Sequence, residues 1–245
     1  TQGIAMMSQS IRRAFLSGVV PASSVLAAGT ATAQELRYSW LDLSYMGQDV
    51  GGITGTQDTP VPGQFVDINA KDGDGVRFRG SYALGERFYF FGEYGSTDID
   101  VDAVVTNDQV VVDASDEFDL TSIRGGIGFR WSVGFSTDIT FELAYDSIDY
   151  DFGSFAGESF DTDAKDVGGS IGIRHMLNDD WEVRAFGRYA NGAQVDLNTL
   201  EFESGALFGV GFSWQLVRGF AVVADYESGD VDTWSLGFRL DMDED

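Results

Sequence analysis

The strongest structural signal in the chain lies in Ser122-Ile123-Arg124-Gly125-Gly126-Ile127-Gly128-Phe129-Arg130-Trp131. Ile, Gly, Phe and Trp occupy the odd positions, and Ser, Arg and Gly occupy the even ones. Because successive side chains of a β-strand point to opposite faces, this segment forms a strand with one apolar face and one charged face. A strand of this kind suits a wall that separates lipid from a polar interior.

The same alternation recurs along the chain. It predicts strands at residues 36–46, 75–84, 88–95, 119–131, 138–147, 166–176, 181–190, 202–216, 220–227 and 233–242. The connections are long at 47–74, 95–118, 148–165 and 191–201, and short at 85–87, 132–137, 177–180 and 217–219; the connection at 228–232 is short although it lies on the long side. Long loops outside and short turns inside are typical of bacterial barrels. The sequence therefore predicts an all-β, transmembrane, antiparallel up-and-down β-barrel of ten strands, with eight strands as the alternative.

Aromatic residues mark the ends of the predicted strands. One tyrosine closes every second strand, and two tryptophans fall at the opposite ends: Tyr45, Tyr94, Tyr145, Tyr189 and Tyr226, with Trp131 and Trp214. Amphipathic aromatic rings favour the headgroup region of a bilayer, where the ring is buried and its polar atom stays wet. We therefore expect an outer tyrosine girdle and a periplasmic tryptophan girdle.

A soluble β-sandwich would also show alternating strands, and it is the main alternative fold. It would have to bury the eight arginines that share the polar face, or leave rows of Phe, Ile and Trp in water. A helical membrane span is excluded, because no run of about 18 apolar residues follows the N-terminal segment.

The N-terminal segment predicts export. Arg12 and Arg13 precede a mildly apolar stretch, and Ala31-Thr32-Ala33 ends in the small residues that a signal peptidase requires. We expect a signal peptide at residues 1–33, cleaved after Ala33, and a barrel domain at residues 34–245. If translation starts at Met6 or Met7, residues 1–5 are an upstream artefact. The paired arginines also resemble a twin-arginine signal, but a barrel with a lipid-facing surface cannot travel folded through water, which favours the general secretory route.

The charge of the chain limits its partners. All 40 acidic residues but only 13 of the 15 basic residues lie after Ala33, so the mature chain carries a formal charge of −27. Nucleic acid is not an expected partner, because phosphate binding needs clustered Lys and Arg. The absence of cysteine is compatible with an oxidising compartment without requiring one.

The strands that end in Tyr followed by Gly or Ser and Asp, the Gly-rich return strand at 124–129, and the aromatic last strand resemble the small outer-membrane barrel proteins of Gram-negative bacteria, the OmpA and OmpX class. The resemblance covers the whole mature chain. It implies a monomer in the bacterial outer membrane, inserted by the outer-membrane assembly machinery and in contact with the lipid bilayer and lipopolysaccharide. Members commonly end on a Phe. This chain instead passes Phe238 and Leu240 to Met242 and an acidic tail.

Charged residues share the inward phase of the strands. The predicted lumen set is Arg77, Arg79, Glu93, Arg124, Arg130, Glu142, Asp146, Arg174, Glu182, Arg184, Arg188, Asp225 and Arg239, with Glu227 beside them. A three-residue turn at 85–87 would place Arg79 opposite Glu93. Paired arginines and carboxylates suit a narrow interior, where an unpaired charge is costly. We expect a plug of ion pairs, with a narrow ion-conducting path as the rival interpretation.

Catalysis is not expected. The single histidine, His175, lies beside a predicted periplasmic turn, no cysteine is present, and no serine motif is recognisable. The sequence points to no cofactor.

Acidic residues are concentrated in the predicted outer loops, for example Asp98, Asp100 and Asp102. They could bind divalent cations that bridge to lipopolysaccharide, or they could simply be solvated. The segment Asp72-Gly73-Asp74-Gly75 has a weak likeness to half of a calcium loop. Three functions remain open: a structural or surface-interaction protein, a narrow channel, and an adhesin or ligand-binding protein that uses loops 48–71 and 99–118.

Overall fold

The computed structural model describes residues 36–49, 54–58, 65–106, 111–155, 158–196, 201–229 and 231–242. Its strands are β1 Trp40–Asp49, β2 Thr54–Asp58, β3 Phe65–Leu84, β4 Phe88–Thr106, β5 Val111–Ser132, β6 Thr137–Phe155, β7 Glu158–Met176, β8 Trp181–Asp196, β9 Glu201–Val217, β10 Phe220–Ser228 and β11 Asp232–Asp241. Among these residues, no helix is long and apolar enough to cross a membrane. The strands belong to one compact unit, Ala33–Asp245, and the predicted signal peptide at 1–33 lies outside the described residues.

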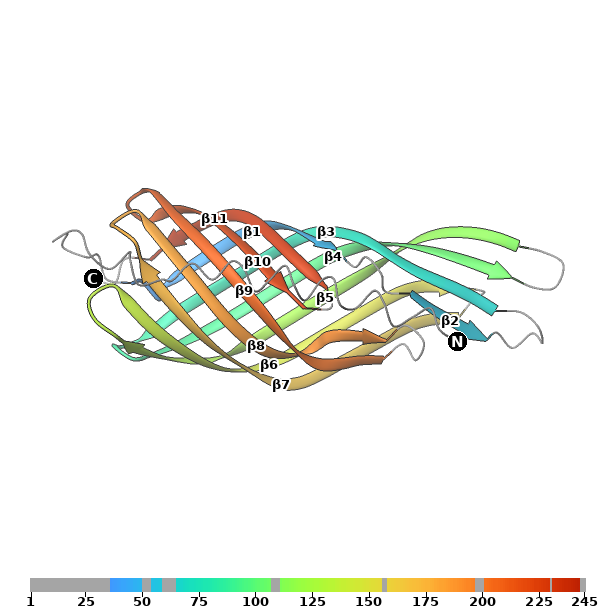
Figure 1. Ribbon diagram of the computed structural model, residues 1–245, viewed down its shortest axis with the longest axis horizontal. Coiled ribbons are helices and arrows are strands. Elements are labelled where there is room, and N and C mark those ends of the chain that lie inside the picture. The colour runs from blue at the N-terminus through green and yellow to red at the C-terminus, as the bar shows by residue number, and fades with distance from the viewer. Residues whose placement is uncertain are drawn as a thin grey trace, which may run out of the picture. The chain divides into compact units, whose positions relative to one another are not determined.

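The strands close into a barrel. Each is antiparallel to its neighbours, and β1 pairs with both β11 and β3, which joins the two ends of the sheet. Within the described ranges, ten strands make up this ring, and the short β2 pairs with the outer part of β3. Figure 1 shows the ring strands running obliquely around the barrel. The predicted ten-strand up-and-down barrel is confirmed, and the soluble sandwich is excluded.

The alternation of the sequence becomes the two faces of the barrel wall. In β1, the outward Leu43 is 60% exposed, whereas its inward neighbour Asp42 is 1% exposed. The register between β3 and β4 is the predicted one, with Tyr82 opposite Phe90 and Arg79 opposite Glu93. Apolar side chains on the outer face meet lipid rather than water, so their exposure has no hydrophobic cost in a membrane.

Short turns join the strands at one end of the barrel. Gly85, Gly134 and Gly219 each lie in such a turn with φ of 76°, 98° and 82°. A side chain at these positions would be strained, because a Cβ disfavours the left-handed region. These turns mark the periplasmic end, as predicted.

The prediction of long outer loops is wrong, because most of these segments are strands. The outer halves of β3 to β7 continue as strands through most of 65–74, 95–118 and 148–165. In 98–104 of β4, aspartates alternate with apolar residues, which suits a strand whose outer face meets water. The sequence prediction ended the strand at residue 95, although the alternation continues through this segment.

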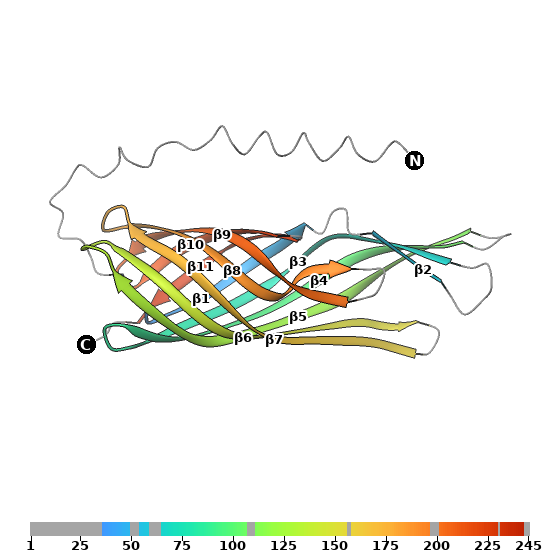
Figure 2. The same cartoon turned by 60° about the horizontal axis from the view of Figure 1, so that its bottom comes forward.

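The strands on one side of the barrel are about twice as long as those on the other side. A tilted strand needs about 9–11 residues to cross a bilayer. The strands β1, β10 and β11 have 9 or 10 residues, whereas β3 to β7 have 19 to 22. The outer halves of β3 to β7 are therefore long enough to extend beyond the lipid. Figure 2 shows them as long hairpins at one end of the barrel.

The start of the first strand differs from the prediction. A strand was expected from residue 36, but β1 begins at Trp40. Leu36 and Tyr38 are 5% and 3% exposed. They lie inside the periplasmic end of the barrel, where they contact strands that are not neighbours of β1.

Candidate functional site: the charged lumen and its two ends

The aromatic residues predicted to form two girdles lie on the outer face of the barrel. Their exposed fractions run from 42% to 61% for Tyr45, Tyr94, Tyr145, Tyr189, Tyr226, Trp131 and Trp214. Trp131 and Trp214 lie at the end with the short turns, and the tyrosines lie toward the other end. Two further tryptophans join them: Trp234 packs on Tyr45, and Trp181 stacks on Trp214 with ring centroids 5.2 Å apart.

One row of register partners in the lumen alternates in charge across neighbouring strands. From β6 through β5, β4, β3 and β1 to β11 it reads Asp146, Arg124, Glu93, Arg79, Asp42 and Arg239. Each member of this row faces an opposite charge on the adjacent strand. Such an arrangement offsets the desolvation of the buried charges.

Ion pairs link this row to β10 and β8. Asp42 binds Arg79 at 2.9 Å and Arg239 at 2.8 Å. Asp225 on β10 binds Arg79 at 2.6 Å and Arg184 at 2.6 Å. The side chains of Asp42 and Asp225 are 0% and 3% exposed, so both carboxylates lie deep in the lumen.

The network continues to both sides of Asp225. Glu227 binds Arg77 at 2.9 Å and Arg188 at 2.8 Å, and Arg77 also contacts Asp225. On β8, Glu182 forms a bidentate pair with Arg174 at 2.7 and 2.9 Å. Side chains from opposite walls are therefore tied together across the bore.

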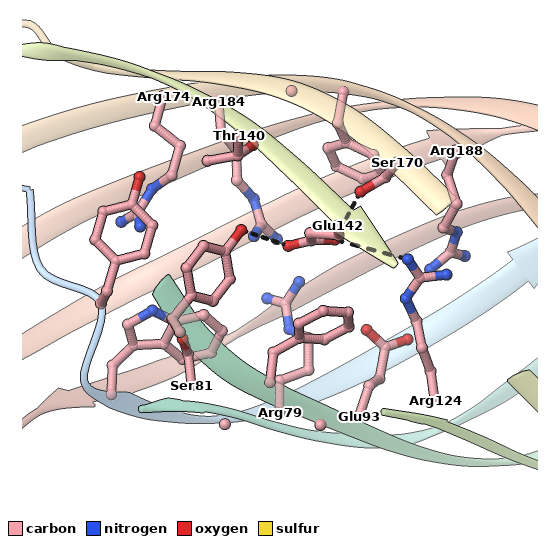
Figure 3. Close-up of a pocket in the computed structure, with 18 of the residues that line it drawn as sticks. Arg79, Ser81, Glu93, Arg124, Thr140, Glu142, Ser170, Arg174, Arg184 and Arg188 are labelled. Carbon is pink, nitrogen blue, oxygen red and sulfur yellow. Dashed lines mark hydrogen bonds and ion pairs between the residues drawn. The ribbon is translucent and has the colours of Figure 1, made fainter. Parts of the chain in front are cut away.

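A second cluster lies on β4 to β7. Arg124 binds Asp146 at 3.1 Å and approaches Glu142 at 3.6 Å. Glu142 also accepts hydrogen bonds from the Tyr89 hydroxyl at 2.9 Å and from Ser170 Oγ at 2.6 Å. Figure 3 shows Glu142 between Ser170 and Arg124.

Two predicted lumen residues have partners other than those expected. Arg79 faces Glu93 in the register, but its ion pairs run to Asp42 and Asp225. Arg130 was expected in an arginine–carboxylate pair. Instead, its side chain donates to the backbone carbonyls of Glu86 at 2.6 Å and Leu36 at 3.3 Å. At this end of the barrel, backbone carbonyl groups accept the hydrogen bonds of the arginine in place of a carboxylate.

Sequence reasoning missed several residues of this site, among them Asp42, Tyr38 and Asp138. Asp42 alternates with Leu41 and Leu43, and this alternation could have identified it as a lumen residue. Tyr38 continues the same inward phase and donates to Asp138 Oδ2 at 3.0 Å. The contact between Tyr38 and Asp138 joins residues 100 positions apart, so no local sequence signal predicts it.

Aromatic and apolar side chains fill the periplasmic end of the lumen. Leu36, Tyr38 and Tyr89 form a buried cluster against Ala83 and other inward side chains. At the outer end, one row of register partners places Met46, Thr97 and Leu120 on the inner face, and all three are buried. The densest part of the ion-pair network therefore lies between these two groups of side chains, while Arg130, Arg174 and Asp138 contact Tyr38 at the periplasmic end.

A cavity of about 110 Å³ remains in the lumen. Its wall includes Tyr38 and Trp40 at the periplasmic side and Arg124, Arg188 and Glu93 further along. Among the described side chains, five buried polar groups on this wall have no hydrogen-bond partner: Trp40 Nε1, Arg79 Nε, Ser81 Oγ, Arg124 Nη2 and Arg188 Nε. The cavity is large enough for several waters or one small polar solute.

The acids beyond the bilayer lie on strands. Asp98 on β4 is opposite Asp74 on β3 and Asp119 on β5, and all three are exposed. A hydrogen bond shared with Asp119 raises the pKa of the Asp98 carboxyl, and the charges of Asp119 and Asp74 add to this effect. Nearby, Asp102 binds Lys71 at 2.7 Å and raises the pKa of this lysine.

The weak likeness to a calcium loop is not supported by the structure. Residues 72–75 lie within β3, so they have the extended backbone of a strand rather than a calcium-binding loop. Within the part of the chain that the structure describes, no three His, Cys, Asp or Glu side chains gather as a metal site. His175 forms a hydrogen bond with Thr137 Oγ1 at 2.7 Å beside the periplasmic turn.

Several solved structures resemble the chain at low sequence identity. The translocator domain of the autotransporter NalP from Neisseria meningitidis is 14% identical, with 83% of this chain and 88% of that chain covered and a TM-score of 0.46. OprG from Pseudomonas aeruginosa is 8% identical, with 87% and 100% covered and a TM-score of 0.44. Ail of Yersinia pestis is 14% identical, with 84% and 100% covered and a TM-score of 0.39. None of the curated proteins compared with the chain matches it.

A comparison with protein-family models identifies the family of the chain. The model of the family described as "Outer membrane protein beta-barrel domain" matches residues 19–243, which is most of the chain. The match agrees with the closed ring of strands, the apolar outer face and the charged lumen. The chain therefore belongs to the outer-membrane β-barrel family and is a protein of the bacterial outer membrane.

Proposed function

We propose that this protein is a closed outer-membrane barrel with a structural or surface-interaction role, whose lumen is plugged by its own side chains. The observation that carries the proposal is the ion-pair network across the bore. Asp42 and Asp225 each hold at least two arginines, and these arginines come from different walls of the barrel. An ion that entered would have to break these short pairs in an interior of low dielectric, which is costly.

The part of the protein beyond the lipid supports the surface role. The outer halves of β3 to β7 form hairpins with exposed acids such as Asp74, Asp98 and Asp119. A rigid sheet outside the membrane offers backbone and side chains to other molecules at low cost in conformational entropy. An adhesin or ligand-binding protein would use the same hairpins.

The partners follow from this placement. We propose that the barrel is monomeric, is inserted by the outer-membrane assembly machinery, and contacts lipid and lipopolysaccharide around its outer face. Divalent cations could bridge the outer acids to lipopolysaccharide phosphates. We propose no catalytic role, because the outer rim offers no histidine base: His175 lies beside the periplasmic turn at 177–180.

A narrow channel is the second candidate. The cavity of about 110 Å³ favours it, since the walls carry arginines and polar groups such as Trp40 Nε1 and Ser81 Oγ that are not used by the protein. A small ion or solute could occupy this space. In that case the inward arginines would set the charge selectivity of the channel.

Planar-bilayer recording of the purified, detergent-folded protein separates these two candidates. A heat-dependent gel shift first verifies that the barrel is folded. We expect no discrete conductance steps from the closed barrel. Regular single-channel steps whose ion selectivity changes in Arg124→Gln would contradict the plug and support the channel.

A further inference from the structure

The short segment Leu36–Ser39 precedes β1 and is held by distant parts of the barrel. Arg130 Nη1 on β5 donates to the carbonyl of Leu36 at 3.3 Å, and Arg174 Nη1 on β7 donates to the carbonyl of Arg37 at 3.1 Å. The neighbours of β1 in the ring are β11 and β3, so contacts with β5 and β7 reach across the bore. The segment therefore lies across the periplasmic mouth of the lumen.

Tyr38 is the centre of this arrangement. Its ring lies between two guanidinium groups, with the Cζ atoms of Arg130 and Arg174 at 4.6 and 4.4 Å from the ring centroid. Its hydroxyl donates to Asp138 on β6, and its ring packs against Tyr89 on β4 with centroids 4.9 Å apart. Cation–π contacts are strongest when they are desolvated, and Tyr38 is 3% exposed.

The cavity lies directly behind this ring. Tyr38 and Arg174 are both part of its wall, together with Trp40 and Ser81. Trp40 and Ser81 are register partners, one step further into the barrel than Tyr38. The ring of Tyr38 therefore stands between the cavity and the periplasmic mouth.

We propose that Leu36–Ser39 is a plug made from the chain itself, which closes the periplasmic mouth and separates the polar cavity from the periplasm. This inference rests on the proposed closed lumen and adds the element that closes one end of it. The ion pairs block the middle of the bore, whereas Tyr38 and its two arginines block the entrance. Loss of the ring would open the cavity to the periplasm without breaking the pairs at Asp42 and Asp225.

A cysteine reporter tests this plug, because the chain has no cysteine of its own. Ser81→Cys places a thiol on the cavity wall, and its reaction with a charged, membrane-impermeant thiol reagent is followed in the purified, detergent-folded protein. With Tyr38 present, the thiol should react slowly. Adding Tyr38→Ala should raise the rate roughly tenfold or more, because two cation–π contacts and one hydrogen bond are lost.

Two matched variants control the experiment. Tyr45→Ala removes a tyrosine from the outer face of β1, the strand that follows the plug segment, and should leave the reaction rate unchanged. Tyr38→Phe keeps the ring between the two arginines and loses only the bond to Asp138, so its rate should stay close to that of the parent. If Tyr38→Ala lacks the heat-dependent gel shift of a folded barrel, Tyr38→Leu replaces it, since leucine still packs against Leu36 and Tyr89.

Equal rates for Ser81→Cys with and without Tyr38 overturn the plug, whether both are fast or both are blocked. The conductance of the unmodified protein is measured separately. Conductance steps from the unmodified protein overturn the proposed closed lumen itself. A silent parent together with equal cysteine rates overturns only the role of Leu36–Ser39.

Discussion

At the scale of single residues, the lumen depends on a few carboxylates that each serve several arginines. Asp225 contacts Arg77, Arg79 and Arg184 at 3.2 Å or less. A buried ion pair is weak evidence of net stability, but removal of one partner leaves the other charges unpaired in a poorly solvated interior. The acids at the branch points of the network should therefore be its most sensitive positions.

Asp225→Asn tests this dependence. We expect it to lower the free energy of unfolding by about 3–5 kcal/mol, because three arginines lose a shared counter-charge. The measurement is urea unfolding of the barrel in lipid vesicles, followed by tryptophan fluorescence. Asp149→Asn, at an exposed outward position of β6, is the control and should change stability by less than roughly 0.5 kcal/mol. Equal effects of the two variants would contradict the counter-charge role of Asp225.

At the scale of elements, the outer halves of the strands combine regular pairing with repulsion between like charges. Asp98 faces Asp74 and Asp119 from the two adjacent strands. The hydrogen bond with Asp119 raises the pKa of Asp98 above that of an unfolded aspartate. The folded sheet therefore binds this proton more tightly than the unfolded chain does, and the sheet gains stability as pH falls through the raised pKa toward the pKa of an unfolded aspartate.

Asp98→Asn should imitate this protonation. At neutral pH, we expect slower amide hydrogen exchange in 97–102 and 117–121 than in the parent, because the central one of three facing carboxylates loses its charge. The difference should shrink as the pH is lowered through the raised pKa of Asp98, after correction for intrinsic exchange rates. Asp180→Asn, in the exposed turn at the periplasmic end, is the control. If the difference in exchange rate between Asp98→Asn and the parent is the same at neutral pH and below the raised pKa of Asp98, the proposal that Asp98 shares a proton with Asp119 is wrong.

At the scale of the whole molecule, the strand pairs that close the barrel are different from those that form the sheet beyond the lipid. The outer part of β5, residues 111–118, pairs with β4, while the pairs between β5 and β6 begin at Asp119. The ring that closes through β1, β3 and β11 lies below this level. The hairpin tip at 101–116 therefore contributes little to closure of the barrel.

Replacement of residues 101–116 by a short turn should leave the barrel folded. We expect an unchanged heat-dependent gel shift and unchanged slow reaction of Ser81→Cys, with loss of any binding that depends on this hairpin. A deletion of the same length across the lipid-spanning part of β5 should abolish the gel shift. Failure of the shortened hairpin protein to fold would show that the outer sheet is needed for closure.

Much of this architecture could be predicted from the sequence. The two-residue period of the strands predicts which side chains point outward and which point inward. The turn residues predict the turns at 85–87 and 177–180, and the first of these turns places Arg79 opposite Glu93. Both signals are local properties of the chain. The ends of the strands could not be predicted so well. Residues 98–104 were expected in a long loop, although their alternation continues that of the strand found there.

The sequence by itself determined the barrel, its two faces and its place in a membrane, because a β-strand encodes the environment of each face in every second residue. Only the tertiary structure decided how the charges are shared: Asp42 and Asp225 bind arginines from several strands, and Tyr38 reaches Asp138 across the bore. These contacts join residues far apart in the chain. They depend on the closure and diameter of the ring and on the space that remains inside it, which no local pattern records.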